Sequence, residues 1–188
     1  AQGKQTHAEV QPLREEDAYP AEPERGYGWE KLFSEQLCEY YLRDFGFETR
    51  TVRFHNVYGP LGTYEGGKEK APAAIARKVA LAEDGSEIEI WGDGEQTRSF
   101  MYIDDCIEGL VRLMASDYRA PLNLGTDRLV TINELVDMVC DIAGKRLRKQ
   151  HDLAKPQGVR GRNSDNSRLR QVLGWEPSTP LEQGLLVT

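Results

Sequence analysis

The chain has 188 residues, of which 39% are hydrophobic and 29% charged, and its formal net charge is −7. These values are typical of a globular protein with one core, or with two lobes that share one. The negative charge argues against a nucleic-acid or anionic-membrane surface, because phosphate backbones are held by a net basic field. No apolar stretch reaches membrane-spanning length and no leader pattern opens the chain. We therefore expect a cytoplasmic protein that meets any anionic ligand with local clusters of arginine and lysine.

Residues 1–22 are polar, contain proline and show no hydrophobic periodicity, so they are predicted to be a tail or loop. From Tyr27 to about Phe45 the apolar residues recur at helical spacing, and Gly46 follows as a natural stop. The segment 48–54, ETRTVRF, alternates around β-branched residues and predicts a strand.

A glycine-rich loop at 62–70 precedes the next predicted helix, residues 71–85. This helix has Pro72 in its first turn, where a missing N–H does no harm. Residues 87–91, EIEIW, predict a strand. The turn GDGE and the segment 97–103, TRSFMYI, then predict a return strand, as in a hairpin.

Capping residues predict three further helix starts, at Asp104 or Asp105, at Thr131 with Glu134 three residues on, and at Thr179 with Pro180 and Glu182 behind it. Apolar runs predict two strands and one short helix, at 120–125, 147–153 and 169–175. Helices and strands thus alternate with crossover-length spacing. This order favours an α/β architecture with a mainly parallel sheet.

Three cysteines, Cys38, Cys106 and Cys140, lie far apart in apolar-periodic segments. Their spacing matches neither a metal site nor a disulfide framework. We therefore predict reduced, buried thiols and no metal centre.

Tyr27 and Lys31 are four positions apart, so on a helix they share one face. A phenol titrates at about 10, and it acts as a base near neutral pH only where something stabilises the phenolate. A neighbouring ammonium does so by favouring the charged form. Such a phenolate can take the proton of an alcohol while hydride leaves the carbon that bears it. The spacing alone leaves two readings open, a proton-transfer pair or an ordinary solvated helix edge.

The motifs that follow this pair narrow the choice. The Y-x-x-x-K helix is followed by RFHNVYGP, then by WGDGEQTRSFMYIDD and then by LNLG. From about Asp17 to the end, the chain resembles the extended short-chain dehydrogenase/reductase family that acts on nucleotide sugars. The segments GGKEKAPAA, WGDGEQTRSF and GVRGRNSDN most resemble its GDP-mannose 3,5-epimerase subfamily. The resemblance implies the C-terminal part of a Rossmann-type, doubly wound parallel sheet with a small α/β substrate-binding lobe, in an enzyme that forms a homodimer.

This resemblance also implies roles for particular residues. Tyr27 and Lys31 would be the catalytic pair and would contact NAD, the lysine through the nicotinamide ribose. Lys70 would be an acid/base residue of the epimerisation. Contacts with the nucleotide sugar are implied for Asn56, Glu69, Lys70, Ala71, Lys78, Gln96 and Thr97.

The reaction implied is an NAD-dependent epimerisation of GDP-mannose to a GDP-galactose type of product, at C3 and C5. Tyr27 takes the proton of the 4-hydroxyl while hydride passes to NAD, which leaves a 4-keto sugar. The ketone acidifies the hydrogens at C3 and C5, so a residue on one face can remove each proton and another can return it from the opposite face. The hydride then returns to C4.

Two arginine-bearing segments support a diphosphate ligand independently of the resemblance. A nucleotide diphosphate needs permanently charged, forked donors, and an acidic protein must supply them locally. QTRSF offers Arg98 beside the side-chain donors of Gln96, and GVRGRNSDN places Arg160 and Arg162 around Gly161. We assign ligand binding to Arg98 and Arg162, whereas a solvated surface charge suits Arg160 better.

One part of an NAD site does not occur in these residues. The glycine-rich turn after a first strand, and the acidic residue about twenty positions later, are not found. The serine or threonine and the cysteine that the family places before the tyrosine helix are not found either. We therefore expect a longer enzyme of which this chain is the C-terminal part, and NAD binding by this chain alone is left open.

The predicted division assigns residues 23–60 and 98–126 to the Rossmann-type domain, and residues 61–97 and 127–188 to the nucleotide-sugar-binding domain. Two alternatives to the 3,5-epimerase stay open. One is another nucleotide-sugar enzyme that forms a 4-keto intermediate, such as a 4-epimerase, decarboxylase or dehydratase. The other is an inactive fragment that binds nucleotide sugars or associates with itself, because an exposed apolar sheet face favours association.

Overall fold

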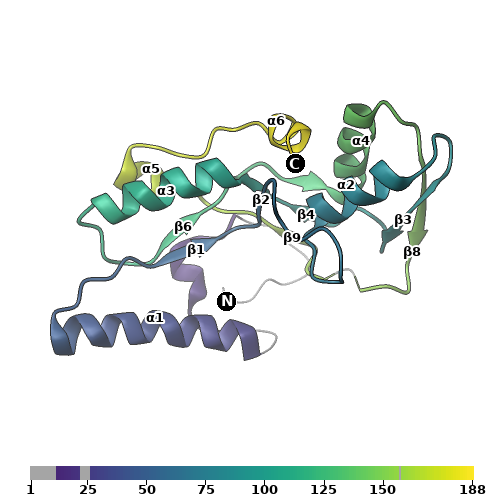
Figure 1. The fold of residues 1–188 in the computed structure, drawn as a ribbon. Coiled ribbons are helices and arrows are strands. Elements are labelled where there is room, and N and C mark those ends of the chain that lie inside the picture. Colours follow the sequence, from purple (N-terminus) through teal and green to yellow (C-terminus); the bar gives the residue numbers. More distant parts are fainter. Residues whose placement is uncertain (1–11, 22–25, 157) are drawn as a thin grey trace.

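The computed structural model describes residues 12–21, 26–156 and 158–188, and Figure 1 shows their arrangement. Residues 1–11 of the predicted tail lie outside the described part. The elements, in chain order, are η1 (Glu15–Ala18), α1 (Gly26–Phe45), β1 (Val52–Phe54), β2 (Val57–Tyr58), α2 (Ala71–Leu81), β3 (Glu87–Trp91), β4 (Thr97–Arg98), β5 (Met101–Tyr102), α3 (Ile103–Ala115), β6 (Leu122–Leu124), β7 (Val130–Thr131), α4 (Ile132–Ala143), β8 (Arg148–Asp152), β9 (Gly161–Arg162), α5 (Ser167–Leu173) and α6 (Leu181–Leu186).

The strands are short and their pairing is mainly parallel. β1 pairs with β6, β2 with β5 and β3 with β8, all in parallel. β4 lies between β9, in parallel, and β7, in antiparallel orientation. Helices α1 and α3 lie on opposite sides of the β1–β6 pair in Figure 1, and the connection from β1 to β6 includes helices, as a pair of parallel strands requires. The predicted α/β architecture with a mainly parallel sheet is confirmed.

The predicted hairpin between the strand 87–91 and the segment 97–103 is wrong. The GDGE turn is present, with Gly92 and Gly94 at φ values of 79° and 75°. It turns the chain away from β3, because Asn133 at the start of α4 donates a backbone hydrogen bond of 3.0 Å to Gly94. β3 pairs along all five residues with β8 instead, which buries Ile88 and Ile90. The return segment divides into β4 and β5, which pair with other strands.

One of the three predicted helix caps is confirmed. At the start of α4, Glu134 N–H donates to Thr131 Oγ1 at 3.0 Å, and Thr131 N–H donates to the Glu134 carboxylate at 2.7 Å. These two bonds form the predicted capping box and satisfy two N–H groups that the helix leaves free.

The other two caps are wrong. Asp105 does not cap α3, because its carboxylate accepts a hydrogen bond of 2.9 Å from the Thr179 backbone. Thr179 does not cap α6 either, since the N-cap residue is Pro180. Glu182 forms a bidentate ion pair with Arg128 instead of completing a capping box. The side chains of Asp105 and Glu182, which local spacing assigned to helix caps, thus bind to distant segments of the chain instead.

Two hydrophobic clusters form the core. The larger one joins α2, β3, α4 and α6 and includes Tyr58, Ile75, Val79, Ile88, Phe100, Leu135 and Leu185. The second joins α3, β6 and α5 and consists of Met101, Cys106, Leu113, Leu122, Leu124 and Leu169. Tyr58, Phe100 and Leu169 each lie in the cluster opposite to the one that the predicted domain division gives them. The division therefore stays a prediction, with packing that crosses it at these residues.

The three cysteines are free thiols. Cys106 and Cys140 are buried, and burial raises the pKa of each thiol. Cys38, in α1, is half-buried. Within the part of the chain that the structure describes, no group of three or more His, Cys, Asp or Glu residues could hold a metal ion.

Helix α1 touches the rest of the molecule over a small part of its surface. All of its residues are described, and Leu32 is the one that is buried. Arg53 of β1 joins it through a bidentate ion pair with Glu35, at 2.7 and 2.8 Å. Its large apolar side chains are exposed at Tyr27, Trp29, Phe33, Leu37, Tyr40, Tyr41 and Phe45. No helix among the described residues is long and apolar enough to cross a membrane.

Candidate functional site

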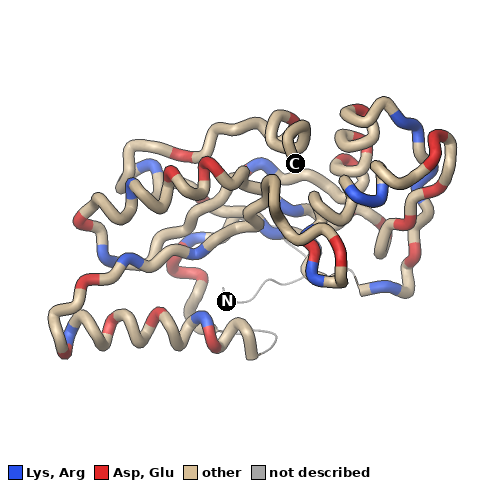
Figure 2. The backbone as a smooth tube through the Cα atoms, in the orientation of Figure 1, with Lys and Arg blue, Asp and Glu red and all other residues tan. Residues whose placement is uncertain are grey.

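Two arginines stand side by side on β4 and β9. The parallel register places Arg98 next to Arg162. Paired residues of neighbouring strands project from the same face of a sheet, and the strands are about 4.8 Å apart. Burial, and next the charge of Arg162, lower the pKa of Arg98. Figure 2 shows basic positions on these central strands of an otherwise acidic protein. An anion between the two guanidinium groups would offset the free-energy cost of holding them together.

Buried polar atoms without a hydrogen-bond partner occur within two chain positions of these arginines. Among the described residues, Gln96 Oε1, Thr97 Oγ1, Ser99 Oγ and Asn163 Oδ1 are buried and accept or donate no hydrogen bond. Buried polar atoms are usually satisfied, so an unsatisfied one can mark a position for a ligand or ordered water. Gln96 and Thr97 were predicted to contact a ligand. Ser99 and Asn163 were missed, because no local pattern marks their burial.

Asn56 holds a strained turn beside β4 and β5. Its backbone is left-handed, with φ at 46°, which is uncommon for a residue other than glycine. Asn56 Nδ2 donates to the Ser99 carbonyl at 3.0 Å, and the Met101 N–H donates to the Asn56 carbonyl at 3.1 Å. The structure therefore brings Asn56 next to the strand that carries Arg98, and its contact with a nucleotide sugar stays a prediction.

His55 is a further residue of this region that the sequence reasoning missed. Its side chain is 2% exposed. A Cβ on Gly125 would lie 2.5 Å from His55 Cβ, so the two backbones approach closely. Burial, and next the charge of Arg162, lower the pKa of His55 to about 4. His55 is therefore neutral at neutral pH and lies near the arginine pair. Its position beside Asn56 in HNVYGP is the one signal that could have indicated it.

The loop before α2 carries the predicted acid/base residue. Lys70 is exposed and occupies the N-cap position of α2, with Ala71 as the first helical residue. Glu69 is half-buried, and hydrogen bonds from backbone N–H groups of the loop, its own first, lower the pKa of its carboxyl. Lys78, about two turns into α2, donates to the Glu89 carbonyl of β3 at 2.8 Å. In this structure Lys78 thus contacts β3, and its predicted contact with the nucleotide stays a prediction.

Tyr27 and Lys31 lie on one face of α1. Lys31 Nζ is 5.0 Å from the centroid of the Tyr27 ring, and it also forms an ion pair of 3.1 Å with Glu30. Tyr27 is 71% exposed. The two residues therefore share one face of the helix, as the spacing predicted, and in Figure 1 the N-terminal end of α1 lies below the middle of the molecule. No hydrogen bond or ion pair between described residues joins this pair to Lys70, so its catalytic role stays a prediction.

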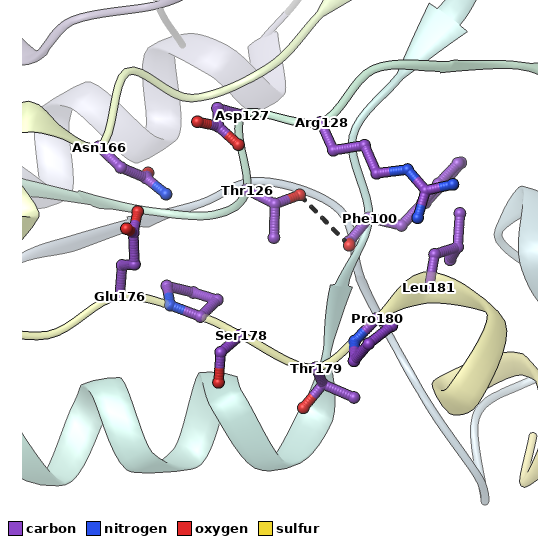
Figure 3. Close-up of a pocket in the computed structure, with 11 residues that line it drawn as sticks. Phe100, Thr126, Asp127, Arg128, Asn166, Glu176, Ser178, Thr179, Pro180 and Leu181 are labelled. Carbon is purple, nitrogen blue, oxygen red and sulfur yellow. Dashed lines mark hydrogen bonds between the residues drawn. The ribbon is translucent and has the colours of Figure 1, made fainter.

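A separate cavity lies away from these residues. It has a volume of about 280 Å³ and opens between the loop 126–128 and the segment 176–181 (Figure 3). Thr126 in its wall donates to the Phe100 carbonyl at 3.3 Å. Arg128 at its edge is held by the ion pair with Glu182. None of the predicted site residues is among the described residues that line it, so we do not assign the nucleotide sugar to this cavity.

Comparison with known sequences shows similarity to nucleotide-sugar enzymes. Residues 3–125 match the family described as NAD dependent epimerase/dehydratase family. The chain is 52% identical over 176 residues to GDP-mannose 3,5-epimerase of Arabidopsis thaliana. The aligned region covers 94% of this chain and 46% of that protein. It is 31% identical to UDP-glucuronic acid decarboxylase 1 of Xenopus tropicalis, over 94% of this chain and 42% of that protein. The chain thus spans about half the length of these relatives.

Solved structures show the same fold. UDP-glucose 4-epimerase from Thermotoga maritima, with UDP-glucose, superposes with a TM-score of 0.85 at 30% identity, over 96% of this chain and 56% of that one. UDP-glucuronic acid 4-epimerase from Bacillus cereus, in complex with UDP-glucuronic acid and NAD, gives a TM-score of 0.79 at 27% identity, over 95% and 55%.

Proposed function

We propose that this chain, which belongs to the NAD dependent epimerase/dehydratase family, binds a GDP-hexose and takes part in the epimerisation of that sugar at C3 and C5. The observation that carries this proposal is the pair of neighbouring arginines on β4 and β9. Two forked, permanently charged donors on one sheet face suit the two phosphates of a nucleotide diphosphate. The similarity to GDP-mannose 3,5-epimerase supports guanosine as the base and mannose as the sugar.

The chemical steps that we assign to this chain use Tyr27, Lys31 and Lys70. Lys31 stabilises the Tyr27 phenolate, which then takes the proton of the sugar 4-hydroxyl. Lys70, exposed at the end of a glycine-rich loop, exchanges the proton at C3 or C5 once C4 is a ketone. Asn56 and the unsatisfied atoms of Gln96 and Thr97 would bind the sugar and its phosphates.

NAD fits one end of this arrangement. When bound there, NAD would supply the acceptance of hydride from C4 and its later return, while Tyr27 and Lys31 handle the proton of the 4-hydroxyl. Tyr27 and Lys31 lie together on an exposed helix face, where a nicotinamide ribose can reach both. The glycine-rich phosphate turn is not among the 188 residues, so the chain's own residues account for the nicotinamide end alone.

We also propose that the enzyme is a homodimer of the cytoplasm. The exposed aromatic face of α1 supports an interface there, because contiguous apolar patches on a surface usually mark an interaction site.

Titration calorimetry with GDP-mannose, and with UDP-glucuronic acid as the comparison, tests the binding. Incubation with GDP-mannose and NAD in deuterated water, followed by NMR, tests the chemistry. We expect binding of GDP-mannose and deuterium at C3 and C5 of the recovered sugar. Preferred binding of UDP-glucuronic acid would overturn the substrate assignment in favour of the decarboxylase alternative, which the similarity to UDP-glucuronic acid decarboxylase 1 supports. Binding of GDP-mannose without exchange would favour the inactive fragment.

A further inference from the structure

Helix α6 packs with unusual closeness on the strands behind the Asn56 turn. Gly184 lies in the middle of α6 and is buried. A Cβ at this position would fall 2.0 Å from Tyr58 Oη and 2.8 Å from Tyr102 Cδ2. No real side chain tolerates such distances, so a residue larger than glycine requires α6 or the tyrosines to move. Glycine is a poor helix former, and this close approach explains its presence in so short a helix.

Tyr58 is fixed by α6 through a hydrogen bond as well as by packing. Its hydroxyl donates to the Leu181 carbonyl at 3.1 Å, and the residue is 6% exposed. Its ring meets the rings of Tyr102 and Phe100 edge-on, with centroids 5.7 and 6.4 Å apart. Leu185 of α6 lies in the same hydrophobic cluster as Tyr58. The side of α6 thus forms one wall of this aromatic group.

The same aromatic group lies behind the candidate site. Tyr58 follows Asn56 by two residues, and its strand pairs with β5 so that Tyr58 lies next to Tyr102. The two hydrogen bonds that hold the left-handed Asn56 turn come from the segment Ser99–Met101, which leads from Arg98 into β5. A shift of Tyr58 or Tyr102 would therefore move both strands that carry the site.

We propose that α6 positions the Asn56 turn, and that Gly184 is the residue that lets α6 pack closely enough on the strands to do so. The contact of Gly184 with Tyr58 and Tyr102 keeps β2 and β5 in register, and so keeps Asn56 against the Ser99 carbonyl. The consequence for ligand affinity rests on the proposed binding of GDP-mannose, whereas the hold on the turn does not.

The test uses Gly184→Ala, which adds one methyl group against the Tyr58 hydroxyl. Its first readout is hydrogen exchange of the Met101 amide by NMR, relative to the amides of β3, because that amide donates to Asn56. Its second is the affinity for GDP-mannose by calorimetry. We expect the relative exchange rate of Met101 to rise about tenfold and the dissociation constant to rise by a similar factor, as expected for a local opening.

Two further variants keep the test decisive. Tyr58→Phe removes the bond to Leu181 but no volume, and should raise the relative exchange of Met101 by about threefold. In the double variant with both Gly184→Ala and Tyr58→Phe, the relative exchange rate of Met101 should rise by less than the product of the two single-variant factors. The reason is that the hydroxyl that the new methyl group would meet is gone. The control Leu32→Ala makes a cavity at α1, outside the hydrophobic cluster that contains Tyr58, and should lower thermal stability without changing the relative exchange of Met101.

The outcomes separate the two proposals. If Gly184→Ala folds and leaves the relative exchange of Met101 unchanged, or if Gly184→Ala does not fold and Tyr58→Phe leaves it unchanged, the positioning role is overturned. Faster exchange with unaltered GDP-mannose affinity overturns the link to binding. If the wild-type chain does not bind GDP-mannose, the proposed substrate fails, while the exchange of Met101 still decides whether α6 holds the turn.

Discussion

Arg98 and Arg162 are direct neighbours on the parallel strands β4 and β9, although the polypeptide between them includes all of α3, α4 and β8. Burial, and next the repulsion from Arg162 on the same face of the sheet, lower the pKa of Arg98. We expect this pair to be the main source of affinity for a nucleotide diphosphate in the proposed site.

Replacing Arg98 by alanine should weaken GDP-mannose binding by about 10- to 100-fold, the value of one or two hydrogen bonds between charged groups. The matched control is Arg160→Ala. Arg160 lies two residues before Arg162, but it is exposed and paired with Asp93 at 2.8 Å. Calorimetry should show affinity within about twofold of wild type for this control, as for an exposed ion pair. An equal loss of affinity in both variants would mean that the general positive charge of this region binds the ligand, and not the pair of Arg98 and Arg162.

Lys70→Ala should abolish deuterium exchange at C3 and C5 of GDP-mannose while it leaves the dissociation constant within about threefold of wild type, because an acid/base group acts mainly in the transition state. Lys68→Ala is the control, since Lys68 lies exposed in the same loop. NMR in deuterated water measures the exchange and calorimetry the binding. A loss of binding that parallels the loss of exchange would assign Lys70 to substrate binding instead.

The ion pair between Arg53 and Glu35 should be the main polar contribution to the docking of α1. Both side chains are nearly buried, at 11% and 13% exposure, so Glu35→Ala leaves a charge with little water around it. We expect the free energy of unfolding to fall by about 3 kcal/mol. In denaturant titrations, Glu108→Ala should lower it by less than about 1 kcal/mol, because the pair of Glu108 with Arg112 is exposed. Similar losses for the two variants would contradict this assignment.

His55 should make stability depend on pH in a defined window. In the folded state its pKa is lowered from 6.5 to about 4, so the unfolded state binds the proton more tightly. The contribution of His55 to stability is fully present above pH 6.5 and is lost as the pH falls towards 4. Over this range the free energy of unfolding should fall by at most about 3 kcal/mol. Unfolding titrations between these values should show a smaller loss of stability for His55→Gln than for wild type. A parallel pH dependence of the two would show that His55 does not supply the effect.

Local sequence patterns predicted much of the secondary structure. Long stretches with clear apolar periodicity, such as α1 and α4, were found with their type correct, since the spacing of apolar residues along a helix is a property of its own sequence. The capping box of Thr131 and Glu134 was also predicted, because both partners lie within one turn. The hairpin at Gly92 failed because a strand takes the partner that buries its apolar face, and for β3 that partner is β8.

The sequence by itself determined which chemical groups this protein has: a tyrosine and lysine one turn apart, a lysine before a helix, arginines in glycine-containing segments, and a family resemblance that the comparisons support. It could do so because spacing along one helix and the order of motifs are one-dimensional properties. Only the tertiary structure decided that Arg98 faces Arg162, that His55 and Ser99 are buried beside them, and that Gly184 closes on Tyr58. These relations depend on strand pairing and burial between distant segments, which no local pattern specifies.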